Sequence, residues 1–274
     1  MTVWICRTCA VEHPDTDEPP EVCEICADER QYVPAAGQQW TTLAELAVDG
    51  RRVVIEEVEP DLFGISVEPR VGIGQRALLV RSRVGNLLWD PTGYLDDDGA
   101  RQIRDLGPVV AVAASHPHMF GAQVEWSRVL GGVPVLVNAV DARWVAREDE
   151  VIEHWSGSVE VVPGIVLHQV GGHFPGSAVA WWAAGAAGAG ALLSGDTVFP
   201  NPDRATVGFM RSYPNLIPMS APVVDRIART LEQLDFDRVY GNFGGVIDMD
   251  ARAAVRRSAD RHMAWVRGDH DDET

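Results

Sequence analysis

The sequence contains no lysine: all 23 basic residues are arginines, and they face 40 aspartates and glutamates. The formal net charge is therefore −17 at pH 7, so the chain lacks the positive excess that binding to nucleic acid or to an anionic membrane requires. We attribute the missing lysine to codon usage and not to function. We expect neither nucleic acid nor a membrane as a partner, and the sequence gives no indication of the oligomeric state.

Long apolar runs are scarce as well. Residues 1–6 have neither the basic start nor the apolar run of a signal peptide. The richest apolar stretch, residues 178–193, is broken by glycines and is barely long enough to span a bilayer. We therefore expect a cytoplasmic protein. With 274 residues, 46% of them hydrophobic, the chain can form one large domain with a substantial core and one small domain.

Cysteine is also rare, and all four cysteines lie within the first 26 residues. Cys6 and Cys9 form one C-x-x-C pair, and Cys23 and Cys26 form a second. Two such pairs, separated by a turn-rich segment, can supply four thiolates to one tetrahedral metal ion. Two disulfides are the alternative, and they do not suit a cytoplasmic chain.

The cysteine segment is too short to fold by hydrophobic burial, so the metal would be its core. Residues 34–37 read as a linker. We therefore expect a separate small domain at residues 1–38 and a larger one at residues 39–274. We also expect the larger domain to stay intact, and its metal site to stay filled, when the small one loses its metal.

Residues 3–34 resemble zinc ribbons and the rubredoxin-like tails of rubrerythrins. Rubredoxin knuckles usually carry glycine after the second cysteine, whereas Ala10 and Ala27 follow here. This departure favours structural zinc over redox-active iron. Iron in the ribbon would instead indicate an electron-transfer protein.

A second concentration of reactive side chains follows the small and apolar residues 109–114, which have the pattern of a strand buried on both faces. His116 and His118 come next, and in an extended chain residues two apart point the same way. Open α/β sheets place their sites at the carboxyl ends of such strands. Two converging imidazoles are half of a zinc site, and two solvated loop histidines are the alternative.

Two further strand ends complete a set of ligands. His173 lies in the Gly-rich turn of residues 171–177, and Asp196 ends the strand of residues 191–194. Either side chain alone is more often an ordinary turn residue. With His116 and His118 they give three imidazoles and one carboxylate, a sound tetrahedral set for zinc.

Strand runs followed by helices occur twice, which indicates two packed sheets with helices outside. Capping signals predict helices that begin at Thr41 or Thr42, at Ser220 and at Asp250. A further helix is expected near residues 142–147. The loop of residues 199–220 leaves directly from Asp196. We expect an apolar pocket for a small-molecule substrate, with a few polar contacts, lined by Phe209, Met210, Arg211, Tyr213 and Asn215 of this loop together with Phe120 and Phe243. An ordinary packed crossover loop is the alternative.

Residues 50–268 resemble the metallo-β-lactamase fold family of metal-dependent hydrolases, which includes glyoxalase II-like enzymes. The marks occur in this order: Ala77-Leu78-Leu79-Val80, Leu87-Leu88-Trp89-Asp90 with Gly93, His116-Pro117-His118, Gly172-His173 and Ser194-Gly195-Asp196-Thr197. The resemblance implies an α+β fold, an αββα sandwich of the metallo-β-lactamase type preceded by the cysteine ribbon. It also implies that Asp90 supports the site without being a ligand.

The departures from this family concern its second metal. The usual motif is H-x-H-x-D-H, and here Phe120 replaces the aspartate and Gly121 the last histidine. The late histidine after the last strand is replaced within residues 241–244. The resemblance therefore implies one metal in this site, with Asp196, usually the bridging ligand, retained. The missing aspartate would accept the proton of the attacking water, and Glu125 is the nearest acidic residue in sequence that can replace it. The alternative is that Glu125 is an ordinary solvated carboxylate on a helix.

These features predict a hydrolase with one zinc ion in the histidine site and one in the ribbon. The substrate would be a small ester, thioester, lactone or phosphoester, because a metal activates water and polarises carbonyl and phosphoryl oxygens. The alternative is a non-catalytic metal-bearing or binding module that kept the fold and lost the dinuclear site.

Overall fold

The computed structural model describes residues 2–274, and its contacts divide the chain into two compact units, residues 1–156 and 157–274. The predicted boundary at residue 38 falls inside the first unit and stays a prediction. Among the described residues, no helix combines the length and the apolar character needed to cross a membrane.

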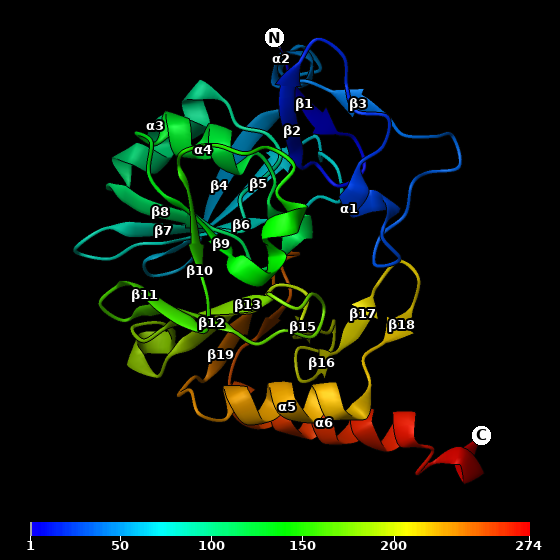
Figure 1. Ribbon diagram of the computed structural model, residues 1–274. Coiled ribbons are helices and arrows are strands. Elements are labelled where there is room, and N and C mark those ends of the chain that lie inside the picture. The colour runs from blue at the N-terminus through cyan, green and yellow to red at the C-terminus, as the bar shows by residue number, and fades with distance from the viewer. Residues whose placement is uncertain (1) are drawn as a thin grey trace. The chain divides into compact units, whose positions relative to one another are not determined.

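The first unit is built on a seven-stranded sheet (Figure 1). Its strands, in spatial order, are β10 (Ile152–Trp155), β9 (Val135–Asn138), β8 (Val109–Ala113), β7 (Asn86–Trp89), β6 (Ala77–Val80), β5 (Leu62–Glu68) and β4 (Arg52–Glu59). The strands from β4 to β7 pair antiparallel, and those from β7 to β10 pair parallel. Parallel neighbours need crossover connections, and helices α3 (Asp97–Asp105) and α4 (Gln123–Val129) supply two of them.

The cysteine segment forms a small sheet of its own within the first unit. Strand β1 (Thr2–Cys6) lies between β2 (Glu12–Thr16) and β3 (Trp40–Thr41), and the short helix α1 (Glu24–Ala27) carries Cys26. The expected helix that follows is α2 (Leu43–Val48). Of the two caps that the sequence predicts, Thr42 is the one observed, and it forms a reciprocal capping box with Glu45.

The second unit is built on a six-stranded sheet in the order β11 (Ser158–Val162), β12 (Ile165–Gln169), β13 (Ala178–Trp182), β14 (Ala191–Leu193), β19 (Arg238–Tyr240) and β20 (Val246–Ile247). Helices α5 (Ala221–Leu231) and α6 (Ala251–Arg267) pack against each other, and α6 also packs against β19 (Figure 1). The apolar stripe of α5 is buried in a core that also receives Val239 of β19 and Val255 of α6. Two hairpins precede α5: β15 (Phe199–Pro200) with β16 (Val207–Gly208), and β17 (Met210–Ser212) with β18 (Ile217–Pro218).

Two expected helix features differ from the structure. The helix expected near residue 142 is a 3₁₀ segment, Ala139–Trp144, capped by the side chain of Asn138. Ser220 and Asp250 do stand at the starts of α5 and α6, but neither side chain makes a capping hydrogen bond with the described residues. Helix α5 is instead held by its buried apolar face, because tertiary packing stabilises helices more than local signals do.

Candidate metal centres

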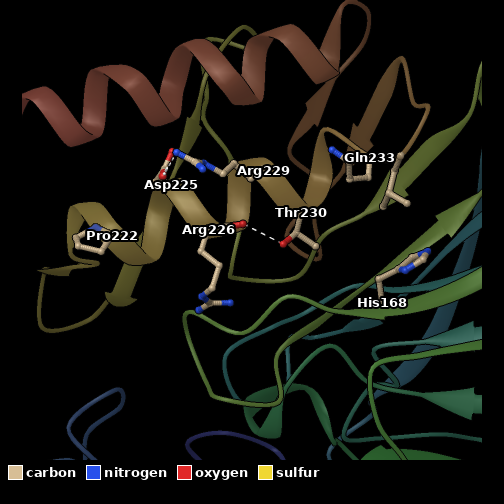
Figure 2. A pocket seen from close by; sticks show the side chains of 8 residues that line it. His168, Pro222, Asp225, Arg226, Arg229, Thr230 and Gln233 are labelled. Carbon is tan, nitrogen blue, oxygen red and sulfur yellow. Dashed lines mark hydrogen bonds and ion pairs between the residues drawn. The ribbon is translucent and has the colours of Figure 1, made fainter.

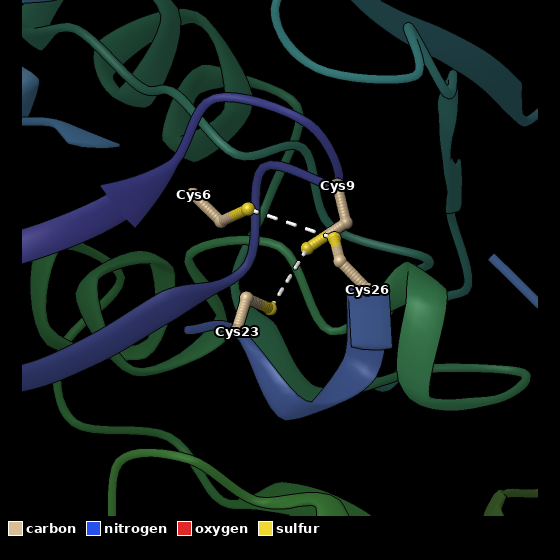
Figure 3. A group of neighbouring side chains, drawn as sticks. All are labelled: Cys6, Cys9, Cys23 and Cys26. Atoms are coloured by element: carbon tan, nitrogen blue, oxygen red, sulfur yellow. Dashed lines mark hydrogen bonds between the residues drawn. The ribbon is translucent and has the colours of Figure 1, made fainter. Parts of the chain in front are cut away.

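The four cysteines converge in the first unit (Figure 3). Cys6 ends β1, Cys9 lies in the turn that follows, and Cys23 and Cys26 lie at the start and within α1. All four side chains are buried, and their sulfur atoms lie within 4.8 Å of one another. The Sγ atoms of Cys6 and Cys26 are 3.7 Å apart, as are those of Cys9 and Cys23.

This spacing fits a tetrahedral metal ion and not disulfides. A disulfide needs sulfur atoms about 2.05 Å apart, and the structure shows four free thiols. Four thiolates at about 2.3 Å from zinc form a tetrahedron with edges of roughly 3.8 Å, close to the observed separations. Gln38 donates from Nε2 to Cys6 Sγ at 3.2 Å and accepts from the Cys23 backbone at 3.1 Å, which ties the two pairs together.

The ribbon contacts the turn that carries Asp90. Ala10 follows Cys9 with φ of +66°, the left-handed conformation that glycine usually supplies. A Cβ atom on Gly93 would lie 2.3 Å from the Ala10 Cβ, so only glycine allows this approach. Gly93, one of the positions on which the family resemblance rests, therefore allows the ribbon to pack closely against this turn of the larger sheet.

Glu12 connects the ribbon to the histidine segment. Its backbone N–H donates to the Gly121 carbonyl at 2.9 Å, and its buried carboxylate accepts from the Val124 N–H at 2.5 Å. The same carboxylate accepts from Arg147 at 2.7 Å. Arg147 also donates to Glu125 at 2.7 Å, so one guanidinium joins the ribbon to α4.

We expect Glu12→Ala to lower the free energy of unfolding by about 3 kcal/mol, measured by urea denaturation at pH 8. Removing one partner of a buried ion pair costs about 3–5 kcal/mol, and the low end applies because Glu125 still pairs with Arg147. Glu21→Ala, an exposed glutamate of the same segment, is the control and should cost less than about 0.5 kcal/mol. Equal losses for the two variants would contradict the anchoring role of Glu12.

The pH dependence of stability gives an independent check on the same residue. Burial raises the pKa of Glu12 from 4.5 to about 7, against the opposing effects of the Val124 N–H and Arg147. The folded chain then holds a proton that the unfolded chain releases, so stability falls as the pH rises from about 4.5 to about 7 and is flat above. Glu12→Gln cannot titrate, and its deficit relative to the wild type should be larger at pH 5 than at pH 8.

The histidine pair lies in the first unit just beyond β8. His116 and His118 are both 2% exposed, and their ring centroids are 5.2 Å apart at 77°. The sequence predicts that an extended chain brings the two rings together, and the structure differs. His116 is extended, but Pro117–Met119 form a 3₁₀ turn that brings the second ring round beside the first.

Asp90 fixes the tautomer of His116 through Ser115. The Ser115 N–H and hydroxyl donate to the two carboxylate oxygens of Asp90 at 2.6 and 3.1 Å, and Ser115 Oγ lies 2.9 Å from His116 Nδ1. A hydroxyl that donates to a carboxylate accepts from the imidazole, so Nδ1 carries the hydrogen and Nε2 offers its lone pair. Asp90 thus supports the histidine without being a ligand, as the resemblance implies.

The second unit shows the same arrangement for His173. Its Nδ1 donates to the Met210 carbonyl at 3.0 Å, so Nε2 again holds the lone pair. This Nε2 lies 3.8 Å from Asp196 Oδ2, too long for a hydrogen bond. Two ligands of one tetrahedral zinc ion stand roughly 3.4 Å apart, so the pair is spaced to share a metal. Asn242 donates to the other carboxylate oxygen at 3.2 Å.

The loop after Asp196 contributes less to the site than expected. Tyr213 does lie beside it, because its ring centroid is 6.2 Å from that of His173 and its hydroxyl donates to the Asp196 carbonyl at 3.2 Å. Burial and the nearby Asp196 carboxylate raise the pKa of Tyr213 well above its usual value. Met210 takes part through its backbone, and Phe209 is fully buried in the core, where its ring meets His262 on α6.

A separate shallow groove of about 600 Å³ runs along α5 in the second unit (Figure 2). Its eight lining residues include His168, Arg226 and Gln233 and none of the predicted metal ligands. Arg226 donates to the Val170 carbonyl at 2.6 Å, and the charges of Asp225 and Arg229 pair at 2.9 Å. We assign no function to this groove.

No protein-family model matches the sequence. The chain is 42% identical to an uncharacterized protein, YmaE of Bacillus subtilis (strain 168), over 265 residues that cover 96% of each chain. The chain belongs to the YmaE family.

Solved structures identify the fold of this YmaE-family protein. The metallo-β-lactamase DIM-1 matches 78% of the chain with 98% of its own length, at a TM-score of 0.59 and 14% identity. The mono-zinc form of FIM-1 from Pseudomonas aeruginosa matches 77% with 96% of its length, at a TM-score of 0.55 and 14% identity. Identities this low show the fold alone, and the predicted metallo-β-lactamase type of α+β fold is confirmed.

Sequence reasoning on this YmaE-family chain missed several supporting residues. Ser115 is a small polar residue next to His116, and nothing in the pattern showed that it links the imidazole to Asp90. Glu12 and Arg147 lie far apart in sequence, so their ion pair had no local signal. Glu125 accepts from Arg128 and Arg147, and its role as a proton acceptor stays a prediction.

Proposed function

We propose that His116 and His118 of the first unit and His173 and Asp196 of the second bind one zinc ion together. The donor set, three imidazoles and one carboxylate, suits zinc and is buried throughout. One observation carries the proposal: His116 and His173 each commit Nδ1 to a protein acceptor, which leaves Nε2 as a metal ligand in both units.

We propose a single metal ion because the residues that bind the second metal in this fold family are replaced. Phe120 is 2% exposed and offers no ligand atom. A Cβ atom on Gly121 would lie 2.1 Å from the Pro91 carbonyl, and φ there is +52°, so a histidine cannot simply replace it. FIM-1, which shares the fold, has been solved in a mono-zinc form.

We propose that the chain is a metal-dependent hydrolase of a small ester, thioester, lactone or phosphoester. A zinc ion supplies an activated water and polarises the bond to be cleaved. The protein's own residues hold that centre: Ser115 and Asp90 orient His116, and the Met210 carbonyl orients His173. The half-buried ring of Tyr213 lies beside His173. Asp196 is the proposed catalytic residue, because it alone brings a carboxylate to the ligand set.

We propose structural zinc in the four-cysteine ribbon, supported by four buried thiols whose sulfur atoms lie within 4.8 Å of one another. Iron would make the purified protein red and would favour electron transfer. Four reduced thiols suit the cytoplasm, where we propose that the protein works. The charge of −17 supports a small-molecule substrate over nucleic acid as the partner.

Metal stoichiometry tests the proposed function. We expect about two metal equivalents per chain after gel filtration through a weak chelator, one for each ligand set. His118→Ala should lose one of them, because a three-ligand remnant with a lone carboxylate binds far more weakly. His154→Ala, which removes an exposed histidine of β10, is the control and should keep both.

Elemental analysis distinguishes the outcomes. Three tightly held metals would contradict the mononuclear site. A histidine site that stays empty under saturating zinc would contradict the hydrolase proposal and favour the non-catalytic module.

A further inference from the structure

Asn242 contacts the proposed zinc site from the position where the family's late histidine is replaced. It lies two residues beyond β19 and is 1% exposed. Its Nδ2 donates to Asp196 Oδ1 at 3.2 Å, while the other carboxylate oxygen of Asp196 faces His173 Nε2. The amide therefore engages one oxygen of the carboxylate and leaves the second for a metal.

The turn that carries Asn242 is fixed by its own unit. The Gly241 N–H donates to the Gly245 carbonyl at 2.9 Å, which closes the turn. Cβ atoms on Gly241 and Gly245 would lie 3.0 and 2.9 Å from Pro200, so β15 packs directly on this backbone. Because β15 follows Asp196 by three residues, the same short segment sets the positions of the carboxylate and of the amide.

The amide oxygen of Asn242 indicates a further partner. Asn242 Oδ1 is buried and has no hydrogen-bond partner among residues 2–274. A buried asparagine that serves only to shape a turn normally has both ends satisfied, since an unmade hydrogen bond costs about 1–3 kcal/mol. The two polar atoms of one amide share a carbon, so this oxygen lies beside Asp196 as well.

We propose that Asn242 is a positioning residue of the zinc site. This inference rests on the proposed function. The amide nitrogen holds Asp196 as a one-oxygen ligand, and the amide oxygen accepts a hydrogen bond from an O–H or N–H group held at the metal. An amide suits this place because it donates to one neighbour, accepts from another and adds no charge.

The test measures, by chelator competition, how tightly zinc binds at the site of the three histidines and Asp196. It also measures how far zinc binding at this site raises the Tm of the protein. Asn242→Leu keeps the branching and the number of side-chain heavy atoms and removes both polar ends. Zinc should therefore bind about 10–100-fold more weakly, the usual cost of losing a residue that supports a ligand. Asn242→Asp places a second carboxylate against Asp196. It should lower Tm without zinc, and zinc should raise its Tm by more than it raises that of the wild type, because the metal relieves the repulsion.

Asn201→Leu is the matched control, since Asn201 lies on the neighbouring hairpin and bonds to Thr206. Its zinc affinity should equal that of the wild type. If both Asn242 variants lower Tm and leave the zinc affinity and the zinc-induced rise unchanged, Asn242 is only a turn residue and this inference is wrong. If His173→Ala also leaves zinc affinity unchanged, the proposed zinc site itself is wrong.

Discussion

Cys23→Ser should unfold residues 2–34 and should also weaken metal binding at the histidine pair. The ribbon buries only short stretches of apolar side chain around the cysteines, such as Ile5 and Ile25. Zinc binding in small zinc-finger peptides contributes about 10–16 kcal/mol to folding, so we expect the metal to supply most of the ribbon's stability. Loss of one thiolate should therefore remove the ribbon metal entirely. Because Glu12 holds the Gly121 carbonyl and the start of α4, we expect the second zinc to bind about tenfold more weakly.

Limited proteolysis and elemental analysis measure these two effects separately. Cleavage sites should appear within residues 2–34, and the ribbon's metal equivalent should be absent. Glu12→Ala is the matched comparison, since it keeps all four thiolates: it should retain the ribbon metal and show the weaker second site alone. If Cys23→Ser loses one metal and leaves the affinity for the other unchanged, the ribbon is the independent domain that its sequence predicts.

The sequence predicts the elements of this fold well where hydrophobic pattern decides them. The buried run before His116 is a central strand, β8, and the stripe from Val224 to Leu231 is the buried face of α5. Local signals were less reliable: Ser220 marks the start of a helix, but the side chain does not cap it. The hydrophobic pattern predicts where helices and strands lie in the chain. The hydrogen bonds of their side chains depend on the neighbours that the tertiary fold brings close.

In the candidate site, too, the positions of the ligands were predicted from the sequence and their supporting contacts were not. Residue type and strand position predict that His116, His118, His173 and Asp196 lie at strand ends, where the structure places them. The supporting contacts could not be predicted, because Ser115 to Asp90 and Glu12 to Arg147 join residues 25 and 135 positions apart. In the sequence, Asn242 is one residue of the segment in which the family's late histidine is replaced. Its hydrogen bond to Asp196 is found only in the structure.

Asp196→Ala should abolish any hydrolytic activity of the protein and most of its affinity for the second zinc. Removing a residue that merely supports a ligand costs about 10–100-fold, so removing the only carboxylate ligand should cost more than about 100-fold. The variant leaves His173 with its Met210 partner, and it also leaves the Asn242 amide without its acceptor. Asp98→Ala, an exposed aspartate of α3, is the control for charge and should behave as the wild type.

Turnover of nitrophenyl esters, thioesters, lactones and phosphoesters, followed with and without chelator, measures the effect of Asp196→Ala. Activity that chelator removes and that zinc restores in the wild type, but not in the variant, is the expected result. An Asp196→Ala protein with full turnover on every substrate of the wild type would exclude the metal-dependent mechanism. A wild-type protein that binds two metals and turns over none of these substrates would favour the binding module, because the same ligand set would then hold a metal without presenting it to a reactive bond.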